Sequence, residues 1–118
     1  MVNKVVLIGN LTADPDVRAS QTGTYVAHLR IATNVYIGKA DDGTRKEATD
    51  FHSVVFFGKQ AEFIGTHFKK GRQVYILGRL HSSSWDDPAT GAKRYKTEVI
   101  GDEFGMLGQK APEAAAAA

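Results

Sequence analysis

The chain has 118 residues, 42% of them hydrophobic and 24% charged, which suits one soluble domain with one modest hydrophobic core. It has no cysteine, which excludes disulfides and thiolate metal sites and fits a reducing compartment. The net charge of +2 is too small to indicate nucleic-acid binding by itself, so such a function would depend on where the basic residues lie.

Three strands are predicted in the first half of the chain. The β-branched run at residues 2–11 predicts a central strand that ends at Asp14–Asp16. This run is too short for a signal-peptide core, and no apolar run reaches the roughly 18 residues of a membrane span, so we expect a cytoplasmic protein without a membrane partner. Residues 24–35 alternate as a second strand. The hairpin pair Asp42-Gly43 separates it from a third strand at residues 47–57.

The hydrophobic period changes at residues 59–70, which predicts a short helix. Ala61, Ile64 and Phe68 share its apolar stripe. Basic residues at the end of this segment suit the last helical turn, and Gly71 is the expected stop.

Two more strands follow at residues 74–85 and 94–100, joined by a polar loop. Three strands, one helix and two strands predict an all-β protein, a five-stranded Greek-key OB-fold barrel with one short α-helix between strands 3 and 4. We expect this domain to occupy residues 1–108. Residues 109–118 form an alanine-rich C-terminal tail that cannot build a core and is expected to be disordered.

Period-two alternation gives the third and fourth strands two distinct faces each. In the third strand, one face carries Phe51, Ser53, Val55 and Phe57, and the other carries His52, Val54 and Phe56. In the fourth strand, the expected core face carries Val74, Ile76, Gly78 and Leu80, and the other carries Tyr75, Leu77, Arg79, His81, Ser83 and Trp85. Aromatic side chains displayed with cations on a sheet form a platform on which nucleic-acid bases stack. Burial in the core is the competing explanation for each aromatic residue taken alone.

Basic residues gather at the two long loops, on both sides of this aromatic face. The first cluster is Lys39, Arg45 and Lys46, and the second is Lys93, Arg94 and Lys96. Each cluster alone is consistent with an ordinary solvated loop, but together they are placed to hold the phosphates of a strand.

The chain strongly resembles the bacterial single-stranded DNA-binding protein family over about residues 2–108. The matching blocks are residues 2–11 with 14–18, residues 31–33, residues 49–59, and residues 70–85 with 95–99. The resemblance implies a homotetrameric OB-fold protein that binds and protects single-stranded DNA, independently of sequence, in replication, recombination and repair. It implies no cofactor, no metal and a nucleoid-associated, cytoplasmic location.

The resemblance also implies site residues. The family's stacking aromatics match Phe51, Phe57 and Trp85. A further stacking tryptophan falls at Ile37, where the neighbouring Tyr36 is a candidate although it would point the other way in a regular strand. The candidate phosphate ligands are Lys39, Lys59, Arg72, Arg79, Lys93, Arg94 and Lys96. Residues 81–84 lack the cations common in the family, so we expect a shallower salt dependence.

Two further expectations concern assembly and partners. His52 matches a position near a subunit interface in the family, while a packed, hydrogen-bonded histidine is the simpler reading. Family members commonly end in an acidic tip that recruits replication and repair proteins. This sequence ends at Ala118 without one, so it is either cut short or a tailless relative, and recruitment through such a tip is not expected.

Other classes of function have less support. The adjacent carboxylates Asp41-Asp42 and Asp86-Asp87 fall in predicted turns, the histidines lack ligand spacing, and no nucleophile has a base beside it, so we expect no enzyme. A protein-interaction OB module is the main alternative, because a fold does not define a function. Single-stranded RNA also remains a possible ligand, because stacking does not select the sugar.

Overall fold

The computed structural model describes residues 1–108, which form six strands and one helix. The elements are β1 (Val5–Leu11), β2 (Asp16–Ala19), β3 (Tyr25–Lys39), β4 (Arg45–Phe57), α1 (Lys59–His67), β5 (Gln73–Asp86) and β6 (Lys93–Leu107). The predicted tail, residues 109–118, lies outside the described residues. No helix in the described part of the chain is long and apolar enough to cross a membrane.

Five of the strands close into a barrel. The sheet order is β1-β5-β6-β4-β3-β2, and a second pairing between β1 and β3 completes the circle. Asn10 pairs with Ala32 and Leu11 with Ile31 at that closure. All neighbours are antiparallel except β4 and β6, which pair in parallel. The predicted five-stranded barrel, with its helix between the third and fourth barrel strands, is confirmed.

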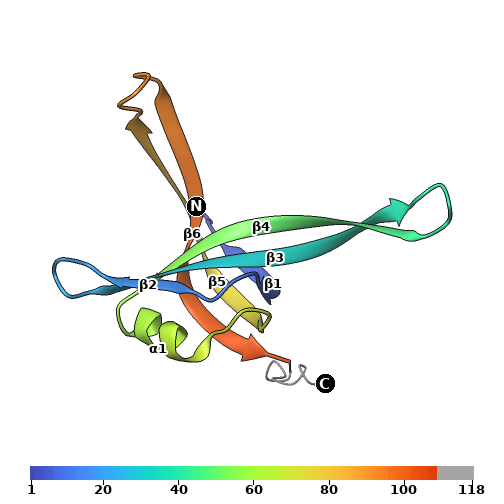
Figure 1. Cartoon of the computed structure of the whole chain (residues 1–118), viewed down its shortest axis with the longest axis horizontal. Helices are drawn as coiled ribbons and strands as arrows, with labels where there is room; N and C mark the ends of the chain where they lie inside the picture. Colours follow the sequence, from blue (N-terminus) through green and yellow to red (C-terminus); the bar gives the residue numbers. More distant parts are fainter. Residues whose placement is uncertain (109–118) are drawn as a thin grey trace.

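Two long hairpins leave the barrel in different directions (Figure 1). We call residues 33–50 the β3–β4 arm and residues 81–98 the β5–β6 arm. In each arm the two strands pair only with each other among the described strands, and they stay in continuous register to their tips apart from one irregularity near Ile37. The turn at the first tip is closed where Ala40 and Thr44 bond through their backbones, which confirms the predicted hairpin around Asp42-Gly43.

The core follows the alternation of the strands. The fully or almost fully buried side chains are Leu11, Ala27, Leu29, Ile31, Val54, Val55, Phe56, Ala61, Ile64, Phe68, Val74, Ile76 and Val99. Phe104 joins the strands to the helix segment, since its ring meets those of Phe56 and Phe68 edge-on at centroid distances of 5.2 Å and 5.3 Å. Burying each large apolar side chain contributes roughly 1.5–3 kcal/mol, so α1 is held to the barrel mainly by this packing.

Leu80 does not belong to the core, contrary to the prediction from alternation. Its side chain is 51% exposed, whereas Val74 and Ile76 are fully buried. The pairing of β5 with β1 ends at Gly78, and the register between β5 and β6 shifts there. A Cβ at Gly78 would collide with the carbonyl oxygen of Ile100, so glycine permits this close crossing. Leu80 continues the core face into the arm, where no barrel remains to cover it.

The helix is shorter than predicted. It ends at His67, and Phe68 already has extended backbone angles. The Lys70 N–H donates to Asp14 Oδ1 at 2.8 Å, and the Gly71 N–H donates to the carbonyl oxygen of Leu11. The lysines therefore lie in a turn that ties the helix segment to the end of β1, and Gly71, at φ +89°, shapes that turn instead of ending the helix.

The short strand β2 was not predicted. The sequence indicated a turn at Asp14–Asp16, yet residues from Asp16 onward pair with β3. Val17 is the one partly buried side chain of β2 and packs against the core cluster, close to Gly65 of α1. A four-residue segment with one partly buried side chain is too short to give a clear periodic signal, so only the packing against the helix reveals this strand.

Candidate nucleic-acid interface

Three aromatic rings share the outer face of β3 and β4. The register places Phe57 opposite Val26, Phe51 opposite Ala32, and Tyr36 opposite Glu47. Paired residues of a ladder point to the same side of the sheet, and each of these pairs lies an even number of residues from the next. The exposed fractions are 48% for Phe57, 54% for Phe51 and 48% for Tyr36. The predicted division into an aromatic face and a buried face with Val54 and Phe56 is confirmed.

Tyr36 and Ile37 are neighbours, but only Tyr36 is paired with a residue of β4. Ile37 has no partner on β4, because the register shifts between Tyr36 and Gly38. The ring of Tyr36 therefore extends the row that begins with Phe57 and Phe51, while Ile37 is the extra residue of a bulge. Tyr36 is opposite Glu47, in the same alternating set as Phe51 and Phe57, so its ring lies on the aromatic face.

Trp85 lies near the tip of the β5–β6 arm and is 48% exposed. Arg94 is its cross-strand partner, and Lys96 is opposite Ser83 two residues away. These three side chains therefore share one face of the arm. Lys93 is opposite Asp86 and belongs to the other face, so the structure divides the predicted second cation cluster between two sides.

Two arginines lie over rings of the β3–β4 face. The guanidinium carbon of Arg30 is 5.4 Å from the centroid of Phe51, and that of Arg45 is 4.6 Å from the centroid of Tyr36. Both distances are typical of cation–π contacts. Arg30 was not among the predicted ligands. The signal that could have found it is its even spacing from Tyr36 along β3, but its proximity to Phe51 depends on the register between strands.

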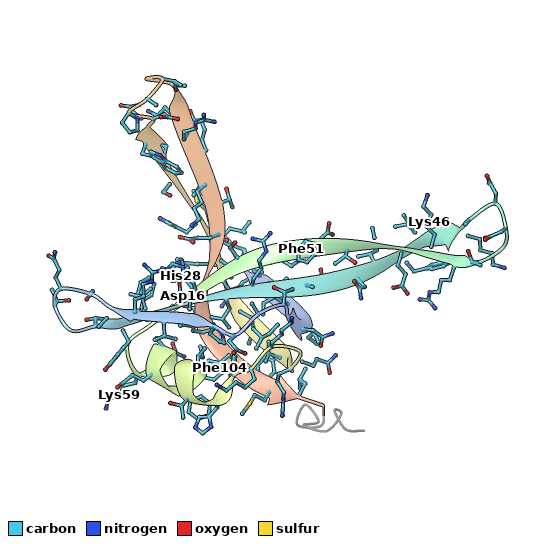
Figure 2. All side chains as sticks on the ribbon, viewed as in Figure 1. Asp16, His28, Lys46, Phe51, Lys59 and Phe104 are labelled. Atoms are coloured by element: carbon cyan, nitrogen blue, oxygen red, sulfur yellow. The ribbon has the colours of Figure 1, made fainter. Side chains whose placement is uncertain are left out.

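A cleft of about 260 Å³ lies at the root of the two arms. It joins the β3–β4 face to the β5–β6 arm, because Arg30 and Ser53 line it from one side and Lys96 and Glu98 from the other. Figure 2 shows Asp16 and His28, which also line it, side by side where the strands converge. Val55 is buried on the otherwise exposed face of β4, since it pairs there with Ile100 of β6.

The remaining predicted cations are placed differently. Lys39 is opposite Arg45 at the tip of the β3–β4 arm, and Lys59 begins α1 two residues after Phe57, so both adjoin the aromatic row. Arg79 forms an exposed ion pair with Asp102, with Nη1 and Oδ1 3.3 Å apart. Arg72 is half-buried with its Nε enclosed, and its carbonyl oxygen accepts from Leu11 at the opposite end of β5 from Trp85. The structure therefore does not bring Arg72 to the aromatic face.

His52 is half-buried, and its Nε2 lies 2.8 Å from Thr33 Oγ1. It is opposite Ile31, on the side of β4 that faces the core. The simpler reading, a packed and hydrogen-bonded histidine, is confirmed within the single chain.

The aspartates at the two hairpin tips serve the turns. The hydroxyl and backbone N–H of Thr44 both donate to Asp42, which lowers the pKa of that carboxyl. The Ala89 N–H and then the Arg94 guanidinium lower the pKa of Asp87. Within residues 1–108, no three His, Asp or Glu side chains are grouped so that they could hold a metal ion.

The chain is similar in sequence to known proteins over most of its length. The profile of the single-strand binding protein family matches residues 2–107. Single-stranded DNA-binding protein 1 of Xylella fastidiosa (strain 9a5c) is 47% identical over 92% of this chain and 79% of its own length. Its namesake in Chlorobaculum tepidum (strain ATCC 49652 / DSM 12025 / NBRC 103806 / TLS) is 44% identical over 92% of this chain and 67% of its own.

Solved structures are similar as well. The SSB of Plasmodium falciparum in complex with ssDNA superposes with a TM-score of 0.77 at 30% identity, over 92% of this chain and 96% of that one. A deletion mutant of the single-stranded DNA binding protein from Thermus aquaticus gives 0.78 at 30% identity, over 93% of this chain and 52% of that one. The chain belongs to the single-strand binding protein family.

Proposed function

We propose that the chain binds single-stranded DNA by stacking bases on the aromatic row and on Trp85, while surrounding cations hold the phosphates. Single-strand DNA binding is the activity of the family to which the chain belongs, and roles in replication, repair and recombination are general within it. Proteins of this family are not enzymes, which agrees with the prediction that the chain has no catalytic activity. We further propose that it acts at the nucleoid, in the cytoplasm.

The observation that carries the proposal is the shared face of Tyr36, Phe51 and Phe57. A soluble protein gains nothing from exposing three rings in a row unless they have a partner. Stacking of a base on an aromatic side chain contributes about 1–3 kcal/mol and accepts any base, which explains binding without sequence preference. Duplex DNA offers no free base faces and should bind poorly.

The proposed phosphate contacts lie beside the same aromatic residues. We assign them to the cations that adjoin the rings on the two arms and at the start of α1. These residues are Arg30, Lys39, Arg45, Lys59, Arg94 and Lys96. Lys93 is a weaker candidate because it is on the other face of the arm, and Arg79 because it is paired with Asp102. The buried Nε of Arg72 argues against a phosphate contact at that residue. Each phosphate that a cation neutralises releases counterions, so affinity should fall as salt rises.

We also propose that the chain assembles as a homotetramer. On the outer surface of the barrel, Val6 is opposite Leu77 and Ile8 is opposite Tyr75. Val6 and Ile8 are largely exposed, and none of these four side chains is charged. From Val5 to Gly9, β1 pairs with β5 alone among the described strands, which leaves the other edge of this part of β1 open. An open edge beside an uncharged apolar surface supports association with a second copy, and His52 is our candidate near that interface.

A titration that follows the single tryptophan tests the proposal directly. Oligo-dT should quench the fluorescence of Trp85 strongly at about 50 mM salt and less at about 200 mM, while a matched duplex should not. A single-stranded RNA competitor measures how far the sugar matters. If neither nucleic acid changes the fluorescence or competes with the other, the protein-interaction module becomes the better explanation.

A further inference from the structure

The cleft at the root of the two arms contains carboxylates where a polyanion is expected to pass. Asp14, Asp16 and Glu98 line it together with Arg30 and Lys96. Negative side chains at the centre of a DNA-binding face oppose phosphate binding, so their presence needs a separate reason.

Two of these carboxylates have partners within the fold. Asp14 Oδ1 accepts the backbone N–H of Lys70 at 2.8 Å, which fastens the turn after α1. Asp16 Oδ1 pairs with Arg18 Nε at 3.3 Å on β2. Their positions are therefore explained by the structure of the single chain.

Glu98 is different. Its side chain is only 17% exposed, and within the described residues its Oε2 is buried without a hydrogen-bond partner. Among the described residues, Lys96 is the cation within ion-pair distance, and its Nζ is 3.5 Å from that oxygen, longer than an ordinary charge-assisted hydrogen bond. A desolvated carboxylate with a single weak contact is ready to accept a better donor.

The proposed DNA contacts would remove even this weak contact. If Lys96 turns toward a phosphate, Glu98 loses this contact, and a donor on the ligand would compensate its largely buried charge. A backbone phosphate offers no donor at neutral pH. A base does, because cytosine, adenine and guanine each carry an exocyclic amino group, whereas thymine carries only its ring N–H.

We propose that this cleft is a nucleobase subsite in which the carboxylate of Glu98 accepts a hydrogen bond from an exocyclic amino group. A carboxylate that accepts from the amino group of cytosine is a recognised pairing. Arg30 supplies complementary donors for a ring nitrogen or carbonyl, and it also lies over Phe51, so the base in the cleft is next to the base stacked on that ring. The volume of about 260 Å³ is sufficient for one base. This subsite rests on the proposed single-strand binding and adds a preference among bases at one position of the bound strand.

The test compares oligo-dC with oligo-dT of equal length, in wild type and in Glu98→Gln, by fluorescence anisotropy of labelled strands. Homopolymers place the same base in the cleft in every binding register. General differences in stacking between the two polymers cancel when the ratio of their affinities is compared between proteins. One net hydrogen bond predicts a dC-to-dT affinity ratio roughly 3- to 10-fold higher in wild type than in Glu98→Gln. The matched control is Glu103→Gln, which changes an exposed carboxylate elsewhere on β6 and should leave the ratio unchanged.

A second measurement uses the wild-type protein alone, in case the variant fails to fold. An oligomer of 2-pyrimidinone, which is cytosine without its amino group, should bind 3- to 10-fold more weakly than oligo-dC. Equal binding of these two polymers would overturn the subsite. So would a Glu98→Gln variant that weakens dC and dT by the same factor, because Glu98 would then only position Lys96. If the proposed function itself is wrong, no single-stranded oligomer binds at all, and this result is distinct from the loss of the subsite alone.

Discussion

The guanidinium carbon of Arg30 lies 5.4 Å from the centroid of the Phe51 ring, on the outer face of β3 and β4. The two residues are 21 positions apart in the sequence, and they meet because Ala32 is opposite Phe51 while Arg30 is two pairs further along, on the same face. Arg45 and Tyr36 repeat the arrangement nearer the tip of the arm. Each ring thus has a cation next to the surface on which a base would stack, so one short segment can hold both a base and a phosphate.

Replacing Arg30 by alanine should weaken binding of oligo-dT and reduce the slope of log affinity against log salt by about one unit. The slope falls because one phosphate-neutralising cation is lost. Lys69→Ala is the control, since Lys69 is an exposed cation in the turn after α1 and not on the aromatic face. A slope that does not differ between these variants would show that Arg30 does not contact phosphate.

Trp85→Ala should weaken DNA binding by roughly 1–3 kcal/mol, the value of one stacking contact. The melting temperature should change little, because about half of the side chain is already exposed. Labelled strands are needed for the measurement, since the variant has no tryptophan left. Tyr95→Ala, on the other face of the same arm, is the control and should bind almost normally. A large drop in melting temperature would instead assign Trp85 a packing role.

The two faces of the β5–β6 arm give a paired prediction for its lysines. Lys96→Ala should reduce the salt slope by about one unit, whereas Lys93→Ala should have a smaller effect. The reason is that Lys96 shares a face with Trp85 and lines the cleft, while Lys93 points to the other side. Equal slopes for the two variants would mean that the strand does not follow the Trp85 face.

Tyr36 and Ile37 are neighbours with opposite expected roles. Tyr36→Ala should reduce affinity for oligo-dT by roughly 1–3 kcal/mol, because the ring continues the row of Phe57 and Phe51. Ile37→Ala should leave affinity unchanged, since Ile37 is the unpaired residue of the bulge. The reverse result would place the fourth stacking position at Ile37 and remove Tyr36 from the site.

Assembly can be tested at the uncharged outer surface of the barrel. Ile8→Glu should lower the molar mass measured by sedimentation equilibrium while circular dichroism retains the strand signal. Ile8 is largely exposed in the single chain, so the charge harms an interface and not the core. Gln21→Glu adds the same charge in the exposed turn before β3 and should keep the wild-type mass. An unchanged mass for Ile8→Glu would locate the interface elsewhere.

Much of the architecture could be predicted from local patterns. Alternation correctly separated Phe51 and Phe57 from Val54 and Phe56, because side chains of a strand point to opposite faces whatever the strand packs against. The apolar spacing of Ala61, Ile64 and Phe68 correctly identified the residues by which the helix segment closes the core. These signals repeat along a single segment, so they can be recognised without knowing which other segments pack beside it.

The errors arose where tertiary contacts override a local pattern. Leu80 follows the core alternation but lies beyond the last pairing with β1, so nothing buries it. Lys70 and Gly71 suit a helix end, yet bonds to Asp14 and Leu11 draw them into a turn. Val17 gave no periodic signal and became part of a strand through packing.

The sequence by itself determined the class of fold, the aromatic face and the family. Only the tertiary structure decided which cations join that face, because the register between strands brings Arg30 to Phe51 and divides Lys93 from Lys96. The cleft beside Glu98 likewise exists only where β3, β4 and β6 converge. The physical reason is that alternation depends on each strand alone, whereas register and convergence depend on hydrogen bonds between segments far apart in the chain.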